Sequence, residues 1–306
     1  MTTLTITEGG AETHMIFLLG RELNNFALFE CLKDPDGRAK LTEMYLSYLQ
    51  CARENGCKMQ LSAPTWRATS EHMVAMGYKA SDVMEYNKMG AEFMRLFRDK
   101  HQHSDGKSVD LVIFGDVGPR GDGYVPDKFM TVDEARDFHS VNVGGLAAGG
   151  VEIIQALTIN YYQEAAGIVL AAKAVNLPVT ISFVVETEGK LVHGMSLHEA
   201  IQKVDEATDG YATHFGINCA HPTHFASTMT DMDPSTLARI KQIRVNASKC
   251  SHAELDEATE LDSGNIEELA EEVADMVNKY NLTIVGGCCG TDNRHIQAMT
   301  RCILQK

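Results

Sequence analysis

The sequence lacks long hydrophobic runs and is poor in basic residues. It contains no stretch of about 18 uncharged apolar residues, so we expect no membrane-spanning helix. Its 27 Lys and Arg are outnumbered by 42 Asp and Glu, which gives a formal net charge of −15. This acidic balance argues against a basic groove for nucleic acid and against binding to an anionic membrane surface.

Signals for export and for domain boundaries are also missing. The opening segment MTTLTITEGG has neither the basic start nor the apolar core of a secretory signal, so we expect a cytoplasmic protein. There is no internal repeat, low-complexity tract or Pro/Ser-rich linker, and we interpret residues 1–306 as one domain. In a reducing cytosol the eight cysteines are more often metal ligands or catalytic groups than disulfides.

Short β-branched runs alternate with longer helical patterns along the chain. Each run is short enough to be a buried parallel strand. The eight runs are Leu4–Thr7, Met59–Ser62, Leu111–Phe114, Glu152–Leu157, Val179–Val185, Thr213–Ile217, Ile243–Val245 and Leu282–Val285. This alternation predicts a (β/α)₈ TIM-type barrel in the α/β class. The alternative is an open doubly wound sheet, which usually has a G-x-G-x-x-G turn after its first strand; Glu8-Gly9-Gly10-Ala11 lacks that spacing.

Helix-start signals lie between the predicted strands. The segment Asn265–Tyr280 places apolar residues on one face at helical spacing. We expect Asn265 to cap this helix and Glu268 to complete a capping box. The same pairing opens two further helices, at Thr131 with Glu134 and at Ser196 with Glu199.

Three cysteines fall at the carboxyl ends of two predicted strands, where a barrel carries its active site. Cys219 closes the sixth strand, and Cys288 with Cys289 closes the eighth. Three converging thiolates would form a tetrahedral zinc site with one position open, which is typical of catalytic zinc. Gly286 and Gly287 would let the backbone bend so that both adjacent cysteines turn inward. The alternative is that these are inert buried cysteines, as single cysteines often are.

Other polar segments near the predicted strand ends give weaker signals. The glycine-rich segment 115–124 lacks the Lys-Ser/Thr of a phosphate-binding loop, and we interpret it as a lid over the barrel mouth. His221 and His224 closely follow Cys219, and a polar loop role is favoured over metal binding, with His221 the alternative fourth ligand. Trp66, the single tryptophan, is either a substrate wall or a packing residue at the rim.

The two cysteine motifs resemble those of the homocysteine S-methyltransferase family. They are Gly216-Ile217-Asn218-Cys219 and Gly286-Gly287-Cys288-Cys289-Gly290-Thr291. Weaker resemblances extend along nearly the whole chain. They are Glu8-Gly9-Gly10 to an opening Asp-Gly-Gly, Thr65-Trp66-Arg67-Ala68 to Thr-aromatic-Gln-Ala, Val117-Gly118-Pro119 to a Gly-Pro turn, and Gly194-Met195-Ser196-Leu197 to Gly-Thr-Pro-Leu.

The resemblance implies a (β/α)₈ barrel that holds Zn²⁺ through Cys219, Cys288 and Cys289 and transfers a methyl group to a thiol. The expected partners are a small thiol acceptor, homocysteine giving methionine, and a free small-molecule methyl donor. The substrate-binding residues that the resemblance implies are Glu8, Gly9, Thr65, Trp66 and Asn218. The sequence does not identify the donor, and a homo-oligomer is compatible with it.

Two departures from the family pattern concern amino-acid recognition. The opening carboxylate is Glu8 instead of Asp, and Leu157 stands where the family usually has a Glu that helps to bind the amino group of homocysteine. An ammonium at that place would lose a charged partner, which is worth about 1.5–3 kcal/mol. Pro64 also replaces the usual Asn before the Thr of the second strand.

These departures keep other functions open. The chain could methylate a different small thiol, or it could be a zinc- or thiol-binding barrel that has lost homocysteine recognition. A zinc hydrolase ranks below both, because such sites prefer His and carboxylate ligands. For Glu8 we predict pairing with a substrate cation; the alternative is a cap on the following helix.

Overall fold

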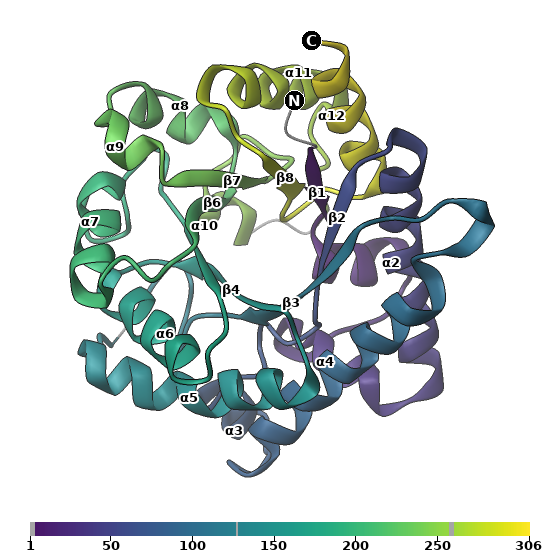
Figure 1. Ribbon diagram of the computed structural model, residues 1–306, viewed down its shortest axis with the longest axis vertical. Helices are drawn as coiled ribbons and strands as arrows, with labels where there is room; N and C mark the ends of the chain where they lie inside the picture. Colours follow the sequence, from purple (N-terminus) through teal and green to yellow (C-terminus); the bar gives the residue numbers. More distant parts are fainter. Residues whose placement is uncertain (1–3, 127, 257–259) are drawn as a thin grey trace.

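The computed structural model describes residues 4–126, 128–256 and 260–306, and it forms a closed barrel of eight parallel strands paired in sequence order (Figure 1). The strands are β1 (Thr5–Thr7), β2 (Lys58–Ser62), β3 (Leu111–Val117), β4 (Ile153–Ile159), β5 (Val179–Phe183), β6 (His214–Ala220), β7 (Ile240–Val245) and β8 (Ile284–Gly287). The predicted TIM-type barrel is confirmed, and the open sheet is wrong because β1 pairs with β8.

Helices surround the barrel and cover the outer face of its strands (Figure 1). They are α1 (Ala11–Thr13), α2 (Pro35–Asn55), α3 (Ser70–Ala75), α4 (Asp82–His101), α5 (Val132–Gly149), α6 (Tyr162–Ala174), α7 (Leu197–Thr208), α8 (Pro222–Thr230), α9 (Pro234–Leu237), α10 (His252–Asp256), α11 (Ile266–Tyr280) and α12 (Asn293–Gln305). Short turns of other helix types are η1 (His14–Leu18), η2 (Asn24–Phe26), η3 (Leu28–Lys33) and η4 (Ser104–Gly106). Within the described ranges, none of the helices is long and apolar enough to cross a membrane.

The three predicted helix starts lie where the sequence indicates. Thr131 forms a full capping box with Glu134 at α5. Ser196 accepts a hydrogen bond from the backbone N–H of Glu199 at α7. At α11, Asn265 accepts from the Glu268 N–H, but the Glu268 carboxylate binds the Lys249 ammonium at 2.6 Å instead of closing the box. A tertiary ion pair has therefore replaced half of that local motif.

The interior of the barrel is polar at the end where the strands finish. Gly115 faces outward, because a Cβ there would touch Leu146 of α5, so its neighbour Asp116 faces inward. On the opposite side of the barrel, Arg244 of β7 also projects inward and reaches Ser62 of β2. Both charged side chains are buried.

A buried ion pair joins strands from both sides of the barrel closure. Arg244 Nη2 lies 2.9 Å from Glu8 Oε1, and the two side chains are only 5% and 2% exposed. The second oxygen of Glu8 accepts from the backbone N–H of Ser62 at 3.3 Å, and Arg244 Nε donates to the Gly287 carbonyl at 3.2 Å. One pair thus connects β1, β2, β7 and the end of β8.

We predict that Glu8→Gln destabilises the fold by about 3 kcal/mol, because it leaves the Arg244 charge buried without its partner. Urea denaturation monitored by far-UV circular dichroism measures this. Glu22→Gln, which changes an exposed carboxylate, is the control and should alter the free energy of unfolding by less than about 0.5 kcal/mol. Equal stability of Glu8→Gln and the wild type would contradict a structural role for the pair.

A buried imidazole makes stability depend on pH. Burial lowers the pKa of His214, in β6, from 6.5 to about 4, so the folded chain keeps it neutral where an unfolded chain is protonated. The free energy of unfolding should therefore fall as the pH drops from 6.5 to 4, by roughly 3 kcal/mol from this group. Urea denaturation near pH 7 and near pH 4 checks this: His214→Gln should lose less stability on acidification than the wild type, and equal losses would exclude His214 as the cause.

Candidate metal centre

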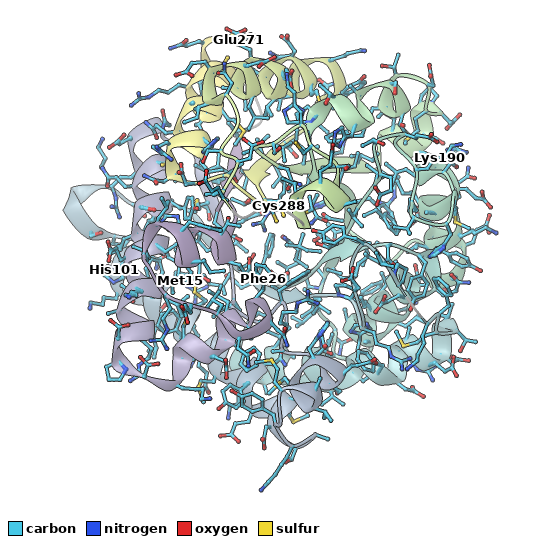
Figure 2. All side chains as sticks on the ribbon, turned by 180° about the vertical axis from the view of Figure 1, so that it is seen from behind. Met15, Phe26, His101, Lys190, Glu271 and Cys288 are labelled. Carbon is cyan, nitrogen blue, oxygen red and sulfur yellow. The ribbon has the colours of Figure 1, made fainter. Side chains whose placement is uncertain are left out.

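The three predicted ligand cysteines come together at the carboxyl ends of β6 and β8. Their sulfur atoms all lie within 4.8 Å of one another, and the Cys219 and Cys289 sulfurs are 3.5 Å apart. Cys288 lies near the middle of the ring of helices (Figure 2). Cys219 is buried whereas Cys289 is exposed, so solvent reaches the cluster from one side.

Backbone irregularities create this convergence. The predicted sixth strand ended at Ile217, but β6 continues to Ala220 and its register with β7 shifts between Asn218 and Ala220. Cys219 adopts a left-handed φ of 57° at this shift, which turns its side chain out of the strand alternation. A non-glycine residue in this conformation is uncommon and strained, and Cys219 adopts it within a strand.

Gly286 and Gly287 allow close approach rather than an unusual bend. Both are the last residues of β8 and neither has a positive φ, so the predicted sharp bend of the backbone at these glycines is wrong. A Cβ on Gly286 would collide with the Thr7 hydroxyl, and one on Gly287 would collide with the Thr291 hydroxyl. The glycine pair therefore packs the end of β8 against β1, which places the following two cysteines at the mouth.

Ionisation of one thiol of the cluster is favoured, and ionisation of the other two is disfavoured. Hydrogen bonds from Cys288, Cys289 and Tyr124 lower the pKa of the Cys219 thiol well below its usual value. The interaction with Cys219 in turn raises the pKa of Cys288 to about 12, and that of Cys289 is also raised. Full ionisation of the three thiols therefore requires a cation among the sulfurs, as at a thiolate metal site.

Two aromatic side chains cover Cys219. The hydroxyl of Tyr124 lies 2.8 Å from the Cys219 sulfur, so the loop after β3, predicted to be a lid, reaches the cluster. The ring of His252 in α10 lies against Tyr124, with centroids 4.1 Å apart and planes tilted by 33°, and its Nε2 is hydrogen-bonded to the Cys219 carbonyl. Sequence reasoning missed His252, because no local motif links α10 to β6.

His221, the alternative fourth ligand, points elsewhere. Its Nδ1 accepts a hydrogen bond from the Thr223 N–H, which caps α8, and its Nε2 lies 3.7 Å from a Glu272 oxygen. His224 binds the Lys249 carbonyl. Both histidines therefore have the polar loop role that the sequence favours.

Asn218 connects the cluster to β4. Its amide oxygen accepts from the Thr158 N–H at 2.8 Å, and its Nδ2 donates to the Thr158 hydroxyl at 2.9 Å. Thr158 has a left-handed φ of 63°, and these bonds hold that conformation. The same Nδ2 lies 4.0 Å from the Cys288 sulfur. Asn218 thus positions the backbone beside the sulfurs, and its predicted contact with substrate stays a prediction.

Thr65 and Trp66 form part of the wall between β2 and β4. The Thr65 hydroxyl donates to the Asp116 carbonyl at 2.7 Å and is buried. Trp66 is half-buried, its Nε1 donates to the Leu157 carbonyl at 3.2 Å, and the Arg67 guanidinium lies 4.3 Å from its ring centre. These contacts place Trp66 at the rim, and substrate contact remains a prediction for both residues.

Glu8 and Gly9 lie where β1 meets the loop after β8. The Glu8 carboxylate faces Arg244, and α1 begins without a side-chain cap, so the capping alternative for Glu8 is wrong. A Cβ on Gly9 would lie 2.7 Å from the Thr291 carbonyl oxygen, and the Gly10 N–H already donates to that carbonyl. The substrate roles predicted for Glu8 and Gly9 stay predictions.

Comparison with known protein sequences identifies the same family over nearly the whole chain. Residues 5–303 match the family model for homocysteine S-methyltransferase. A methionine synthase from Mycobacterium leprae (strain TN) is 25% identical over 245 residues, which are 73% of this chain but only 18% of that protein. A selenocysteine Se-methyltransferase from Brassica oleracea var. italica is 23% identical over 284 residues, which are 86% of this chain and 79% of that protein.

Solved structures share the fold. The homocysteine methyltransferase MmuM from Escherichia coli matches in its oxidised form with a TM-score of 0.77 and 18% identity, covering 98% of this chain and 96% of that one. Its metallated form matches with a TM-score of 0.74 over the same shares of both chains. Since the family model spans all eight strands and both cysteine motifs, this chain belongs to the homocysteine S-methyltransferase family.

Proposed function

We propose that this protein transfers a methyl group from a small-molecule donor to a thiol, with Zn²⁺ held by Cys219, Cys288 and Cys289. Homocysteine, giving methionine, is the acceptor that family membership supports. The observation that carries the proposal is the convergence of the three sulfurs within 4.8 Å at the barrel mouth. Three thiolates suit Zn²⁺, which takes sulfur ligands tetrahedrally and keeps one position open in catalytic sites.

The chemistry is a displacement at carbon. A bound Zn²⁺ would lower the pKa of the acceptor thiol, whose usual value is about 8.5, so that the acceptor reacts as a thiolate. The acceptor sulfur forms a bond to the methyl carbon while the bond from that carbon to the donor breaks, and the electron pair leaves with the donor. A sulfonium or quaternary ammonium donor departs as a neutral sulfide or amine, so no general acid is required.

The residues of this chain therefore act mainly by orientation. The Tyr124 hydroxyl and the His252 ring fix Cys219 on its buried side. Asn218 holds Thr158 against the Cys288 side of the cluster. The exposed side, at Cys289, is left for the two substrates.

Leu157 supports a second candidate acceptor, a small thiol other than homocysteine. Its side chain is apolar and only 6% exposed, at the position where the resemblance calls for a carboxylate. A screen of sulfonium and betaine donors against thiol acceptors, with and without added Zn²⁺, separates the candidates. Methionine formation from homocysteine supports the proposed function, whereas no methyl transfer to any thiol would overturn it.

We predict that the purified protein binds about one zinc per chain. Cys219→Ala, Cys288→Ala and Cys289→Ala should each lower the zinc content sharply, because each removes one of only three protein ligands. Inductively coupled plasma mass spectrometry after dialysis measures the zinc. Cys57→Ala, a buried cysteine at the amino end of β2, is the matched control and should retain the metal. Full zinc retention in all three ligand variants would exclude the cluster as the site.

A further inference from the structure

Asp116 is a buried carboxylate at the barrel mouth that the site described above does not use. It is the last but one residue of β3, it faces the barrel interior, and it is only 7% exposed. Its Oδ1 is buried and has no hydrogen-bond partner in the described part of the chain. A buried carboxylate oxygen without a donor is costly, so this position is unfavourable in the free protein.

Two arginine side chains lie near the barrel mouth. Arg244 binds the Glu8 carboxylate, and its remaining contacts are with the Gly287 carbonyl, the Ser62 hydroxyl and the Glu8 carbonyl. Arg67 lies over the Trp66 ring and is hydrogen-bonded to His72 through Nη1, while its buried Nε has no hydrogen-bond partner in the described residues. Neither guanidinium makes a hydrogen bond to Asp116.

A further carboxylate adds negative charge at the same mouth. Glu12 lies in α1, directly after the turn at which Gly10 packs against the Cys288 carbonyl. Burial raises the pKa of Glu12 to about 7, and Cys288 contributes to the rise. Burial also raises the pKa of Asp116; the charge of Arg244 opposes this rise, and those of Glu8 and Glu12 add to it. The mouth therefore has more carboxylates than it can pair with its own cations.

Hydrogen-bonding capacity distinguishes among the cations that could bind to Asp116. The unpartnered Oδ1 of Asp116 requires a donor, and a methylsulfonium or quaternary ammonium group has none. A primary ammonium has three N–H donors and a full positive charge. The residue of β4 directly opposite is Gln155, a buried amide whose own polar atoms have no hydrogen-bond partner in the described residues; it is neutral, so it cannot balance a carboxylate charge.

We propose that Asp116 binds the α-ammonium group of an amino-acid thiol, so that the enzyme selects amino-acid acceptors over simple thiols. This inference rests on the proposed methyl transfer to a thiol. Asp116 is then a specificity residue on β3, and the carboxylate absent at Leu157 of β4 is replaced from the adjacent strand.

The test compares homocysteine with 4-mercaptobutanoate, which has the same thiol and carboxylate but no amino group. Isothermal titration calorimetry on the zinc-loaded protein measures binding, and methyl transfer gives kcat/KM. The wild type should bind homocysteine at least ten-fold more tightly. Asp116→Asn should weaken homocysteine binding and kcat/KM ten-fold or more, and change both values for 4-mercaptobutanoate less than three-fold.

Asp110→Asn is the matched control, because Asp110 directly precedes β3 at the opposite end and is exposed. It should leave both thiols unaffected. Asp116→Asn should also keep or raise the melting temperature, because it removes a buried carboxyl group whose Oδ1 has no partner. Equal wild-type affinity for the two thiols, or an equal loss of both in Asp116→Asn, would overturn the ammonium site while leaving thiol methylation intact. No binding of either thiol would overturn the proposed function together with this inference.

Discussion

The close approach of three cysteine sulfurs, whose charges would repel one another on ionisation, is the constraint around which the carboxyl end of this barrel is organised. Sulfurs within 4.8 Å of one another can hold one negative charge through hydrogen bonding, and further charge requires a cation. This arrangement requires a strained backbone at Cys219, whose left-handed conformation lies at a shift in the register between β6 and β7. Close packing at Gly286 and Gly287 brings β8 near enough to complete the cluster.

The Glu8–Arg244 pair lies inside the barrel, next to the strand ends that carry the cysteine cluster. It connects four neighbouring strands at the point where the barrel closes, and one of its hydrogen bonds ends on Gly287, next to Cys288. A buried ion pair adds little net stability compared with apolar packing, but it fixes a unique arrangement of its partners. We infer that the pair sets the register of β1 and β8, on which the direction of the two following cysteines depends.

Features that depend on local sequence were predictable, and features that depend on distant partners were not. The alternation of strands with helices and the strand-end positions of Cys219 and Cys288 follow from short-range patterns, and the barrel confirms them. The partner of Glu8 lies 236 residues away, so sequence reasoning assigned the carboxylate to a substrate or a cap. His252 also escaped prediction, because only the closed barrel brings α10 over Cys219.

Asp116 was harder to identify from the sequence, because what distinguishes it is that its Oδ1 has no hydrogen-bond partner among the described residues. Sequence analysis treated it only as part of the glycine-rich segment 115–124. The structure shows that Arg244 binds Glu8 and that the Oδ1 of Asp116 is left without a partner, and no pattern along the chain reveals either fact. Folding alone would favour an uncharged residue at such a position. A carboxylate kept there at a cost in stability indicates selection for what enters the barrel mouth, because violations of packing rules concentrate at functional sites.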